Sequence, residues 1–449
     1  MTQAAIETRP AQDTDTLAGK RIVIVGGGSN EFAARGNPFV DRARELDVSV
    51  LLLAEERSID SVDAQLLIPV ENVDYQSCYD ALAAYLAQHP IDGITTFLEE
   101  YIELTARLQN AFGFKGHSAW GSHACRNKWI MRNLQRDHSL PHPKFMLLDS
   151  RQDATDIARC FPMPAFLKPV DGAGSIGTRR VDTADELPVA FDGVCRAIVQ
   201  SIPAGFRTSV LQAFTVGQAN LLLEEYLAPT ERLARLGLGR VGIELLVQDG
   251  QVKFFAMADG ECVSATDHRY VSLSFPSRLN AQDQQAFREL ANKVVVAFGL
   301  SDGPIVLDAV MTDSGPQLYE INARMEGAMI LPALQRCYGV DMVEQALRIA
   351  TGLPVETEHA ETSKSASSVF FALAGSRSEV LSIDLPEPDS NTCECRVSRH
   401  KSPGDTVAGP EAPYDALAIV TITGPDREAV DQCLLNYRSN MAIELKELD

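Results

Sequence analysis

The segment Leu307–Gly327, which reads LDAVMTDSGPQLYEINARMEG, limits the fold of this chain more than any other stretch. Two runs with the apolar content of strands flank Thr312–Pro316, which has the composition of a turn. The spacing predicts two strands joined by a short turn. Because side chains alternate between the faces of a strand, polar residues placed two apart in this hairpin share one face.

Four polar side chains interrupt the hairpin. Asp308 lies within the first run, and Glu320, Asn322 and Arg324 alternate along the second. Two carboxylates and an amide are oxygen ligands of the kind that Mg2+ prefers, and a guanidinium beside them suits a phosphate or a carboxylate. The pattern therefore indicates nucleotide chemistry. A hairpin with an ordinary polar face is the alternative that this segment alone leaves open.

A glycine-rich segment, Pro164–Val181, lies upstream and reads PAFLKPVDGAGSIGTRRV. An apolar strand ends at Lys168, and the loop Gly172–Gly177 follows. Glycines let several backbone N–H groups approach a polyanion, and the lysine adds a mobile positive charge. The segment is not a Walker A loop, because its lysine precedes the glycines, whereas the lysine of a Walker A loop follows them. The order predicts a phosphate-binding loop, with a plain hairpin turn as the alternative.

Together with two further segments, these motifs resemble the ordered motifs of the ATP-grasp superfamily. The further segments are ACRNKWIMR around Lys128 and the acidic hinge LLLEEYL at Leu221–Leu227. The resemblance covers roughly residues 20–355. It implies an enzyme of the EC 6.3 type that joins a carboxylate to an amine through an acyl-phosphate. ATP and Mg2+ would be required, with Mn2+ as a substitute metal.

The resemblance implies a site for the phosphates of the nucleotide. Lys128 and Lys168 would hold them from two sides, while the backbone at Gly174 and the hydroxyl of Ser175 close over them. The small domain that carries this loop would act as a lid that keeps water from the acyl-phosphate.

The resemblance also places the adenine in a slot along the hinge. The Glu225 carbonyl and the Leu227 N–H would meet the edge of the base, with Tyr226 between them and Glu224 at the amino group. The ribose contact is open, because the family commonly has G-x-E-x-S-V-E after the hinge and this chain reads APTERLARLGLGRVGIE.

Two residues of that departing stretch are candidates for the ribose hydroxyls. Glu231 would serve ahead of an insertion, or Arg240 would replace the glutamate. Glu244 aligns with the last acid of the family stretch.

The hairpin would supply the metal site and the catalytic group. Asp308, Glu320 and Asn322 match the magnesium positions, and Arg324 matches the arginine that steadies the acyl-phosphate. Gly327 would leave room for the substrate backbone. With Lys168 on the phosphates, Arg324 and Glu320 complete the predicted catalytic set.

Candidate substrate residues come from two other places. Glu99 aligns with a glutamate that lies near the amino group of a bound amino acid in the L-amino acid ligases, and Glu100 is the alternative by one residue. An acid in the first turn of a helix is also favoured by the helix dipole without any function. His268 and Arg269 lie in a long polar connection that either shapes specificity or is a surface loop.

The first strand, Arg21–Val25, precedes a glycine triplet, and a helix at Asn37–Leu46 and a strand at Val48–Leu53 follow. This βαβ pattern is typical of a Rossmann-like domain. The G-x-G-x-x-G spacing fails because Glu31 and Phe32 occupy the region of the third glycine, so NAD is not expected.

At 449 residues the chain exceeds one typical domain. The expected fold is α/β with α+β lobes: an ATP-grasp fold with a Rossmann-like N-terminal domain, a two-lobed nucleotide cleft and a small β-rich cap. The expected parts are a disordered lead (1–19), a Rossmann-like domain (20–125), the small ATP-grasp subdomain or lid (126–225), the large subdomain with the metal site (226–355) and a C-terminal cap (356–449).

Composition narrows the function further. A formal charge of −21 argues against nucleic acid as a partner. No apolar run approaches a membrane span, and residues 1–20 lack the pattern of a signal peptide, so we expect a cytoplasmic protein. Nine scattered cysteines fit reduced thiols. Cys393 and Cys395 have no second pair near in the sequence, which disfavours zinc.

An intact ACRNK segment, an EINAR strand and a C-terminal extension resemble the L-amino acid ligase branch, which makes dipeptides. That branch commonly has a glutamate in place of Asp308, whereas an Asp/Glu/Asn set is also typical of D-alanine–D-alanine ligases. A biotin-carboxylase-like enzyme and an ATP-binding module without catalysis are further alternatives. The expected partners are small amino acids or other carboxylates, and the cap would have a structural or homodimerising role.

Overall fold

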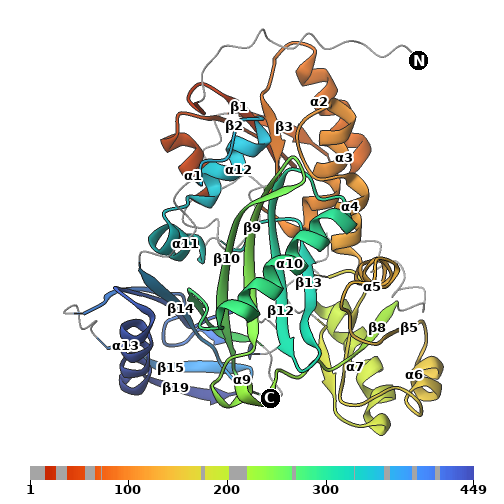
Figure 1. Cartoon of the computed structure of the whole chain (residues 1–449), viewed down its shortest axis with the longest axis vertical. Coiled ribbons are helices and arrows are strands. Elements are labelled where there is room, and N and C mark those ends of the chain that lie inside the picture. The colour runs from red at the N-terminus through yellow and green to blue at the C-terminus, as the bar shows by residue number, and fades with distance from the viewer. Residues whose placement is uncertain are drawn as a thin grey trace.

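The computed structural model describes residues 16–26, 38–55, 66–71, 73–172, 177–201, 220–264, 269–327, 329–357, 365–386, 392–409 and 415–448. Most of the expected lead lies outside these ranges, as do three residues of the predicted site: Gly174, Ser175 and His268. The described parts form an N-terminal domain, a small lobe, a large lobe and a C-terminal region beside the large lobe (Figure 1).

The N-terminal domain is built on a parallel sheet with the strand order β3-β2-β1-β4. Its strands consist largely of buried Val, Ile and Leu, as parallel strands covered on both faces require. The predicted βαβ opening is confirmed. The elements are β1 (Arg21–Val25), α1 (Pro38–Glu45), β2 (Ser49–Glu55), β3 (Leu66–Val70), α2 (Tyr75–Leu86), β4 (Gly93–Thr95), the 3-10 helix η3 (Glu99–Tyr101) and α3 (Ile102–Phe112).

The order of these elements places Glu99 beside the sheet edge that the carboxyl ends of the parallel strands form. It is the first residue of η3, which begins shortly after the carboxyl end of β4. In open α/β sheets, ligands bind beyond the carboxyl ends of the parallel strands. Gly26, which follows β1, has a positive φ of 70°, and a Cβ there would lie 2.1 Å from the ring of Tyr101. Glycine thus allows η3 to pack tightly against this edge.

The small lobe has an antiparallel sheet with the order β5-β8-β6-β7. Its helices α6 and α7 pack on this sheet around a separate apolar cluster. Helix α5 begins at Lys128 because the side chain of Asn127 caps it by accepting from the Ile130 N–H. The elements of the lobe are β5 (Phe145–Leu148), α6 (Arg151–Ile157), β6 (Ala165–Pro169), β7 (Arg179–Val181), η4 (Ala184–Glu186), α7 (Leu187–Ser201) and β8 (Leu221–Glu225). The two helices that precede them, α4 (Ala119–Arg126) and α5 (Lys128–Asp137), contribute buried residues to the large-lobe core.

The large lobe contains the predicted metal hairpin. Asp249 and Gly250 join β9 to β10 with φ angles of 51° and 71°, as a type I′ turn requires. The segment from Leu331 to Ala350 forms two helices because Gly339 ends the first in a left-handed conformation. The elements are α9 (Glu231–Arg235), β9 (Arg240–Gln248), β10 (Gln251–Cys262), β11 (Tyr270–Phe275), α10 (Ala281–Phe298), β12 (Gly303–Thr312), β13 (Gly315–Asn322), α11 (Leu331–Tyr338) and α12 (Met342–Ala350).

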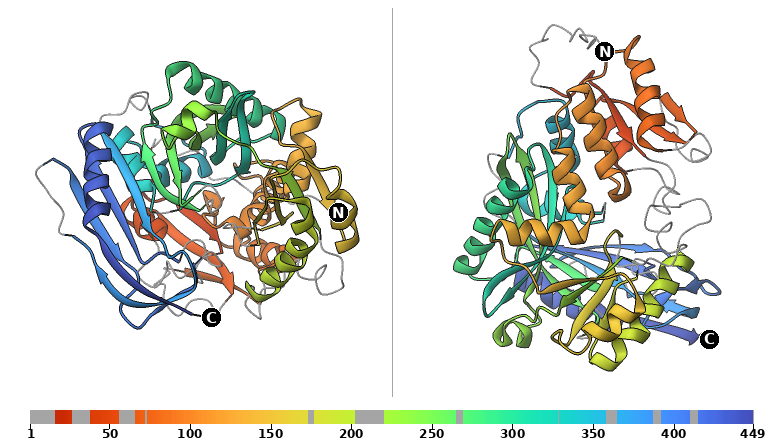
Figure 2. Two further views of the ribbon diagram at one scale, coloured as in Figure 1. Left: turned by 90° about the horizontal axis from the view of Figure 1, so that it is seen from below. Right: turned by 90° about the vertical axis from the view of Figure 1, so that its right-hand side faces the viewer.

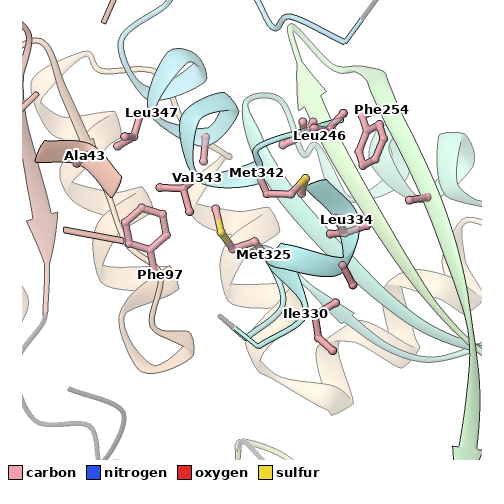
Figure 3. Close-up of a cluster of buried hydrophobic side chains, with 14 of the residues drawn as sticks. Ala43, Phe97, Leu246, Phe254, Met325, Ile330, Leu334, Met342, Val343 and Leu347 are labelled. Atoms are coloured by element: carbon pink, nitrogen blue, oxygen red, sulfur yellow. The ribbon is translucent and has the colours of Figure 1, made fainter. Parts of the chain in front are cut away.

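The two faces of the large-lobe sheet have different partners. One face packs on α10 through a cluster that includes Ile243, Leu245 and Ile321. The other face contributes Leu246 and Phe254 to a cluster that also contains Phe97 of the N-terminal domain and residues of α11 and α12 (Figure 3). Burial of apolar surface therefore holds the N-terminal domain against the large lobe.

The C-terminal region is less separate than the expected cap. Strand β14 pairs with β11, so one eight-stranded sheet runs in the order β13-β12-β9-β10-β11-β14-β18-β16 across the boundary expected at residue 356. Figure 2 shows this region beside the large lobe. The elements are β14 (Ala366–Ala372), β15 (Ser378–Asp384), β16 (Glu394–Arg399), β17 (Thr406–Val407), β18 (Ala418–Gly424), α13 (Arg427–Asn440) and β19 (Ala442–Glu447).

Ion pairs between side chains also hold the C-terminal region against the large lobe. Arg427 of α13 donates to Asp259 of β10 at 2.8 Å, and Arg438 donates to Glu261 at 2.8 Å. Among the helices that the structure describes, none is long and apolar enough to cross a bilayer.

Candidate active site

The register of the large-lobe strands brings the predicted metal residues together. Asp308 of β12 lies directly opposite Glu320 of β13, and Val306 lies opposite Asn322. A bulge follows the Asp308 pair, and both Leu318 and Ile321 point into the core under α10. Glu320 and Asn322 thus share the face of the sheet that is turned away from α10.

Lys128, the first residue of α5, contacts this face. Its Nζ lies 2.7 Å from Oε1 of Glu320 and donates to the carbonyl oxygen of Gly172 at 3.2 Å. Burial alone would raise the pKa of Glu320, but the ammonium groups of Lys128 and Lys168 lower it to about 2. Glu320 is therefore ionised at neutral pH.

Lys168 belongs to a second buried cluster. Its Nζ lies 2.6 Å from Oε2 of Glu224. Arg132 donates to the same carboxylate twice, from Nε to Oε1 at 2.7 Å and from Nη2 to Oε2 at 3.3 Å. Burial lowers the pKa of Lys168, and the positive charge of Arg132 lowers it further. Burial raises the pKa of Glu224, but Arg132 and Lys168 outweigh it and keep it low. Glu224 thus remains a charged partner for both cations.

Arg132 is a site residue that the sequence analysis missed. Its side chain is fully buried and also donates to the Tyr319 carbonyl and to Oε1 of Gln135. A signal was present in KWIMR, since residues four apart lie on one side of a helix. Helix α5 therefore presents Lys128 and Arg132 together, one turn apart.

Tyr270 is a second missed residue. Its hydroxyl lies 3.2 Å from Oδ1 of Asp308 and donates to it. Burial and the nearby carboxylates of Glu326 and Glu320 raise the pKa of Asp308 to about 7. Glycine at position 260 makes this contact possible, because a Cβ there would lie 2.3 Å from the Tyr270 ring.

These residues fit a bound Mg2+. Asp308, Glu320 and Asn322 offer two carboxylates and an amide, and a divalent cation would offset the charge repulsion that raises the pKa of Asp308. Within the described ranges, no three His, Cys, Asp or Glu side chains group into a metal site of their own. This suits a metal that takes its remaining ligands from substrate phosphates and water.

The N-terminal domain contributes Glu99 to the site. Oε2 of Glu99 lies 2.9 Å from Nη2 and 3.3 Å from Nε of Arg324, while Oε1 accepts from Arg126 at 2.6 Å. Glu100 is exposed, and no ion pair with Arg324 is found for it among the described contacts. The geometry thus favours Glu99 over the neighbouring alternative as the residue that meets Arg324.

A family model described as the ATP-grasp domain matches residues 161–332. This chain carries an ATP-grasp domain. The match covers β6 to β13 and ends at the start of α11, and the predicted recognition of the superfamily is confirmed.

Solved structures agree on the fold. The crystal structure of an L-amino acid ligase from Bacillus licheniformis superposes with a TM-score of 0.77 at 17% identity, covering 97% of this chain and 100% of that chain. A biotin carboxylase from Campylobacter jejuni superposes with a TM-score of 0.63 at 16% identity, covering 95% and 92%. The predicted ATP-grasp fold with an N-terminal parallel sheet is confirmed.

Curated relatives include two ligases. Carnosine synthase 1 of Homo sapiens is 24% identical over 272 residues, which are 59% of this chain and 31% of the relative. A D-alanine–D-alanine ligase of Azoarcus sp. strain BH72 is 26% identical over 341 residues, which are 74% of this chain and 97% of the relative. The chain spans less than two thirds of the length of the first relatives that it matches.

The ATP-grasp hinge follows β8. Backbone N–H groups of Glu225 and Tyr226 donate to the carbonyls of Lys144 and Pro164. The Leu227 carbonyl accepts from the Tyr319 hydroxyl at 3.0 Å. These bonds fix the hinge, and the adenine roles of Glu225, Tyr226 and Leu227 remain predictions. Glu224 is held by Lys168 and Arg132, and its contact with an adenine amino group also remains a prediction.

The two ribose candidates of the ATP-grasp site have different surroundings. Glu231 has a side chain that is 80% exposed and pairs with Arg235 on the same helix. Arg240 lies 5.0 Å from the ring centroid of Tyr319 and donates to Sγ of Cys262 at 3.3 Å. Arg240 is thus the candidate that lies on the site face of the sheet.

Three other predicted residues have clear positions. Among the described residues, no atom lies within 4 Å of where a Cβ on Gly327 would lie, and its role beside the substrate backbone remains a prediction. Arg269 is buried and donates to the Ala374 carbonyl at 2.9 Å, which gives it a structural contact with the C-terminal region. Glu244 is buried, and its Oε2 has no hydrogen-bond partner in the described part of the chain. Burial first, and then Glu326, raises the pKa of Glu244 well above its ordinary value.

Proposed function

We propose that this chain is an ATP-dependent carboxylate–amine ligase that activates an amino acid as its acyl-phosphate and transfers the acyl group to a second amine. The observation that carries this proposal is that Glu320 pairs with Lys128 and Arg324 pairs with Glu99, while Glu320 and Arg324 lie close together at the end of β13. The first pair suits a metal-bound nucleotide, and the second suits an amino acid. The names of the similar ligases support the same class.

The Glu99–Arg324 pair favours a zwitterion as the activated substrate. An amino acid that enters between the two side chains replaces one ion pair by two: its carboxylate meets Arg324 and its ammonium meets Glu99. A simple carboxylic acid would break the same pair and leave Glu99 facing a second negative charge, which costs free energy in a largely buried site. The side chains of Glu99 and Arg324 are only 12% and 15% exposed.

The reaction proceeds in two steps. A carboxylate oxygen attacks the γ-phosphorus of ATP, the bond to the β-phosphate oxygen breaks, and ADP leaves. The second amine, in its neutral form, then attacks the acyl carbon, inorganic phosphate leaves, and the nitrogen loses a proton. Phosphoryl transfer depends mainly on positioning and charge neutralisation. When bound, Mg2+ would offset the negative charge of the phosphates.

This chain supplies charge and position for both steps. Lys128 and Lys168 hold phosphate oxygens, for which they exchange part of their contacts with Glu320 and Glu224. Arg324 holds the carboxylate bidentately and then its phosphorylated form. Within this class, the dipeptide-forming L-amino acid ligase activity is the specific form that we propose, on the structural likeness over nearly the whole chain.

The test is incubation with ATP, Mg2+ and pairs drawn from a panel of L- and D-amino acids. We expect release of ADP and phosphate only with the right pair, and a product mass equal to the sum of the two amino acids minus water. A product from D-alanine alone would instead place the chain with the D-alanine–D-alanine ligases. Nucleotide binding without any phosphate release across the panel would favour a non-catalytic ATP-binding module.

A further inference from the structure

Arg126, the last residue of α4, joins two carboxylates from different parts of the chain. Its Nη1 lies 2.6 Å from Oε1 of Glu99 in the N-terminal domain. Its Nη2 lies 2.9 Å from Oδ1 of Asp171, which follows β6 of the small lobe. A guanidinium can hold two carboxylates at once because its N–H groups diverge in a fixed plane.

Asp171 belongs to a short segment that is tied to the nucleotide lysines. Lys168 precedes it by three residues on the same strand end. The backbone of Asp171 pairs with Asn127, and the Lys128 N–H donates to the Val170 carbonyl at 2.7 Å. Any displacement of Asp171 therefore moves the backbone that positions both phosphate-binding lysines.

Glu99 belongs to the other half of the site. Its second oxygen is held by Arg324, two residues beyond Asn322 in the metal hairpin. The four side chains thus form one row in the order Arg324, Glu99, Arg126 and Asp171. Their exposures are 15%, 12%, 14% and 30%, so solvent screens these pairs less than it screens surface ion pairs.

We propose that Arg126 is a positioning residue that makes nucleotide affinity depend on the bound amino acid. The proposal rests on the proposed function, because it needs an amino acid whose ammonium meets Glu99. That ammonium takes the place of Arg324 on Glu99 and draws the carboxylate toward the bound amino acid and away from Arg126. Asp171 then becomes the main partner of Arg126, and the strand end beside Lys168 is held more firmly.

The coupling must be reciprocal. If the amino acid tightens nucleotide binding by some factor, the nucleotide tightens amino-acid binding by the same factor. A factor on the order of 10 is expected, near the lower part of the range that is usual for coupled sites. Arg126 contacts neither substrate. Its loss therefore removes the dependence of nucleotide affinity on the amino acid, while the affinity for each substrate alone stays close to normal.

The experiment measures binding of a non-hydrolysable ATP analogue with Mg2+ by calorimetry, without and with an equimolar mixture of the twenty L-amino acids. For the unaltered protein we expect the Kd of the analogue to fall about tenfold when the amino acids are present. In Arg126→Gln the two values should agree within a factor of two, while the Kd without amino acids stays within about threefold of normal.

A second variant guards against a folding effect of Arg126→Gln. Asp171→Asn keeps the Glu99–Arg126 pair and removes only the contact with the small lobe. In this variant, too, the Kd of the ATP analogue should no longer change when amino acids are added. Arg126→Lys should restore part of it, since an ammonium can meet one carboxylate fully but not both. Arg151→Gln is the matched control, because it removes an exposed pair with Asp192 elsewhere in the small lobe and should behave as the unaltered protein.

Product analysis separates the two proposals. If the unaltered protein forms an amide but Arg126→Gln keeps the full tenfold dependence, the role of Arg126 is overturned and the ligase activity stands. That role is equally overturned if the unaltered protein forms an amide and shows no dependence. If the unaltered protein forms no amide with any pair, the proposed function fails, and the role of Arg126 fails with it.

Discussion

Nζ of Lys128 lies 2.7 Å from Oε1 of Glu320, although the first residue begins helix α5 and the second lies far along the sequence on strand β13. The pair holds the lysine that we predict to bind phosphate beside the predicted metal ligand. Substrate phosphates would therefore meet a site whose charges are already in place, which is how electrostatic catalysis avoids reorganisation.

Loss of either Lys168 or Glu320 should stop catalysis. Lys168→Ala and Glu320→Ala should each lower kcat by at least about 100-fold, since each loses charge stabilisation of the transferring phosphoryl group. Circular dichroism should show a retained fold in both. Lys293→Ala, an exposed residue of α10, is the control and should keep normal turnover. Turnover near normal in either site variant would contradict the assignment.

Glu99 should act on the amino acid and not on ATP. Glu99→Gln keeps the shape but removes the charge that meets the substrate ammonium, so the KM for the activated amino acid should rise by roughly tenfold or more. The KM for ATP should change much less. Steady-state kinetics with each substrate varied in turn provide the check, and a larger change in the KM for ATP would remove Glu99 from the amino-acid pocket.

Tyr270 should tune the metal site through Asp308. Tyr270→Phe removes the hydroxyl that donates to Asp308, which makes the ionised carboxylate less favourable. Partners of this kind are typically worth about 10- to 100-fold in metal affinity. The Mg2+ concentration for half-maximal activity should rise accordingly, and saturating Mg2+ should restore much of the rate. Tyr85→Phe, on α2, should leave the Mg2+ dependence unchanged.

His117 should make stability depend on pH. Burial lowers its pKa to about 4, and its ring contacts the Pro304 carbonyl at 3.3 Å. The unfolded chain, with a pKa near 6.5, binds this proton more readily than the folded protein between pH 6.5 and 4, so stability is lost as pH falls through that window. From pH 7 to pH 5 the loss from this residue alone is roughly 2 kcal/mol.

Urea denaturation at the two pH values measures this loss. His117→Gln lacks the titrating group, so its free energy of unfolding should fall by less over the same interval, whatever its stability at pH 7. An equal fall in both proteins would show that His117 does not cause the pH dependence.

Local patterns predicted the parts of the site that lie on one element. The hairpin with Asp308 and Glu320 followed from the alternation of its side chains and from its turn residues. The branch-specific choice of Glu99 needed the resemblance, because an acid in a first helical turn has an ordinary explanation.

Contacts between distant elements could not be predicted in this way. Arg132 meets Glu224 across 92 positions of the sequence, and no local pattern encodes that pairing. Tyr270 reaches Asp308 only because position 260 is a glycine, a steric condition that appears once the strands are in register. The pairing of β14 with β11, which joins the C-terminal region to the large-lobe sheet, was not predicted for a similar reason, since it is non-local.

The most direct test of acid activation is the fate of a carboxylate oxygen. The protein is incubated with ATP, Mg2+ and an amino-acid pair from the panel in which the activated carboxylate carries 18O, and the inorganic phosphate is analysed by mass spectrometry. Attack of the carboxylate on the γ-phosphorus predicts one 18O atom in phosphate for each amide formed, together with ADP. Amide formation with unlabelled phosphate, or with AMP and pyrophosphate, would contradict the acyl-phosphate route.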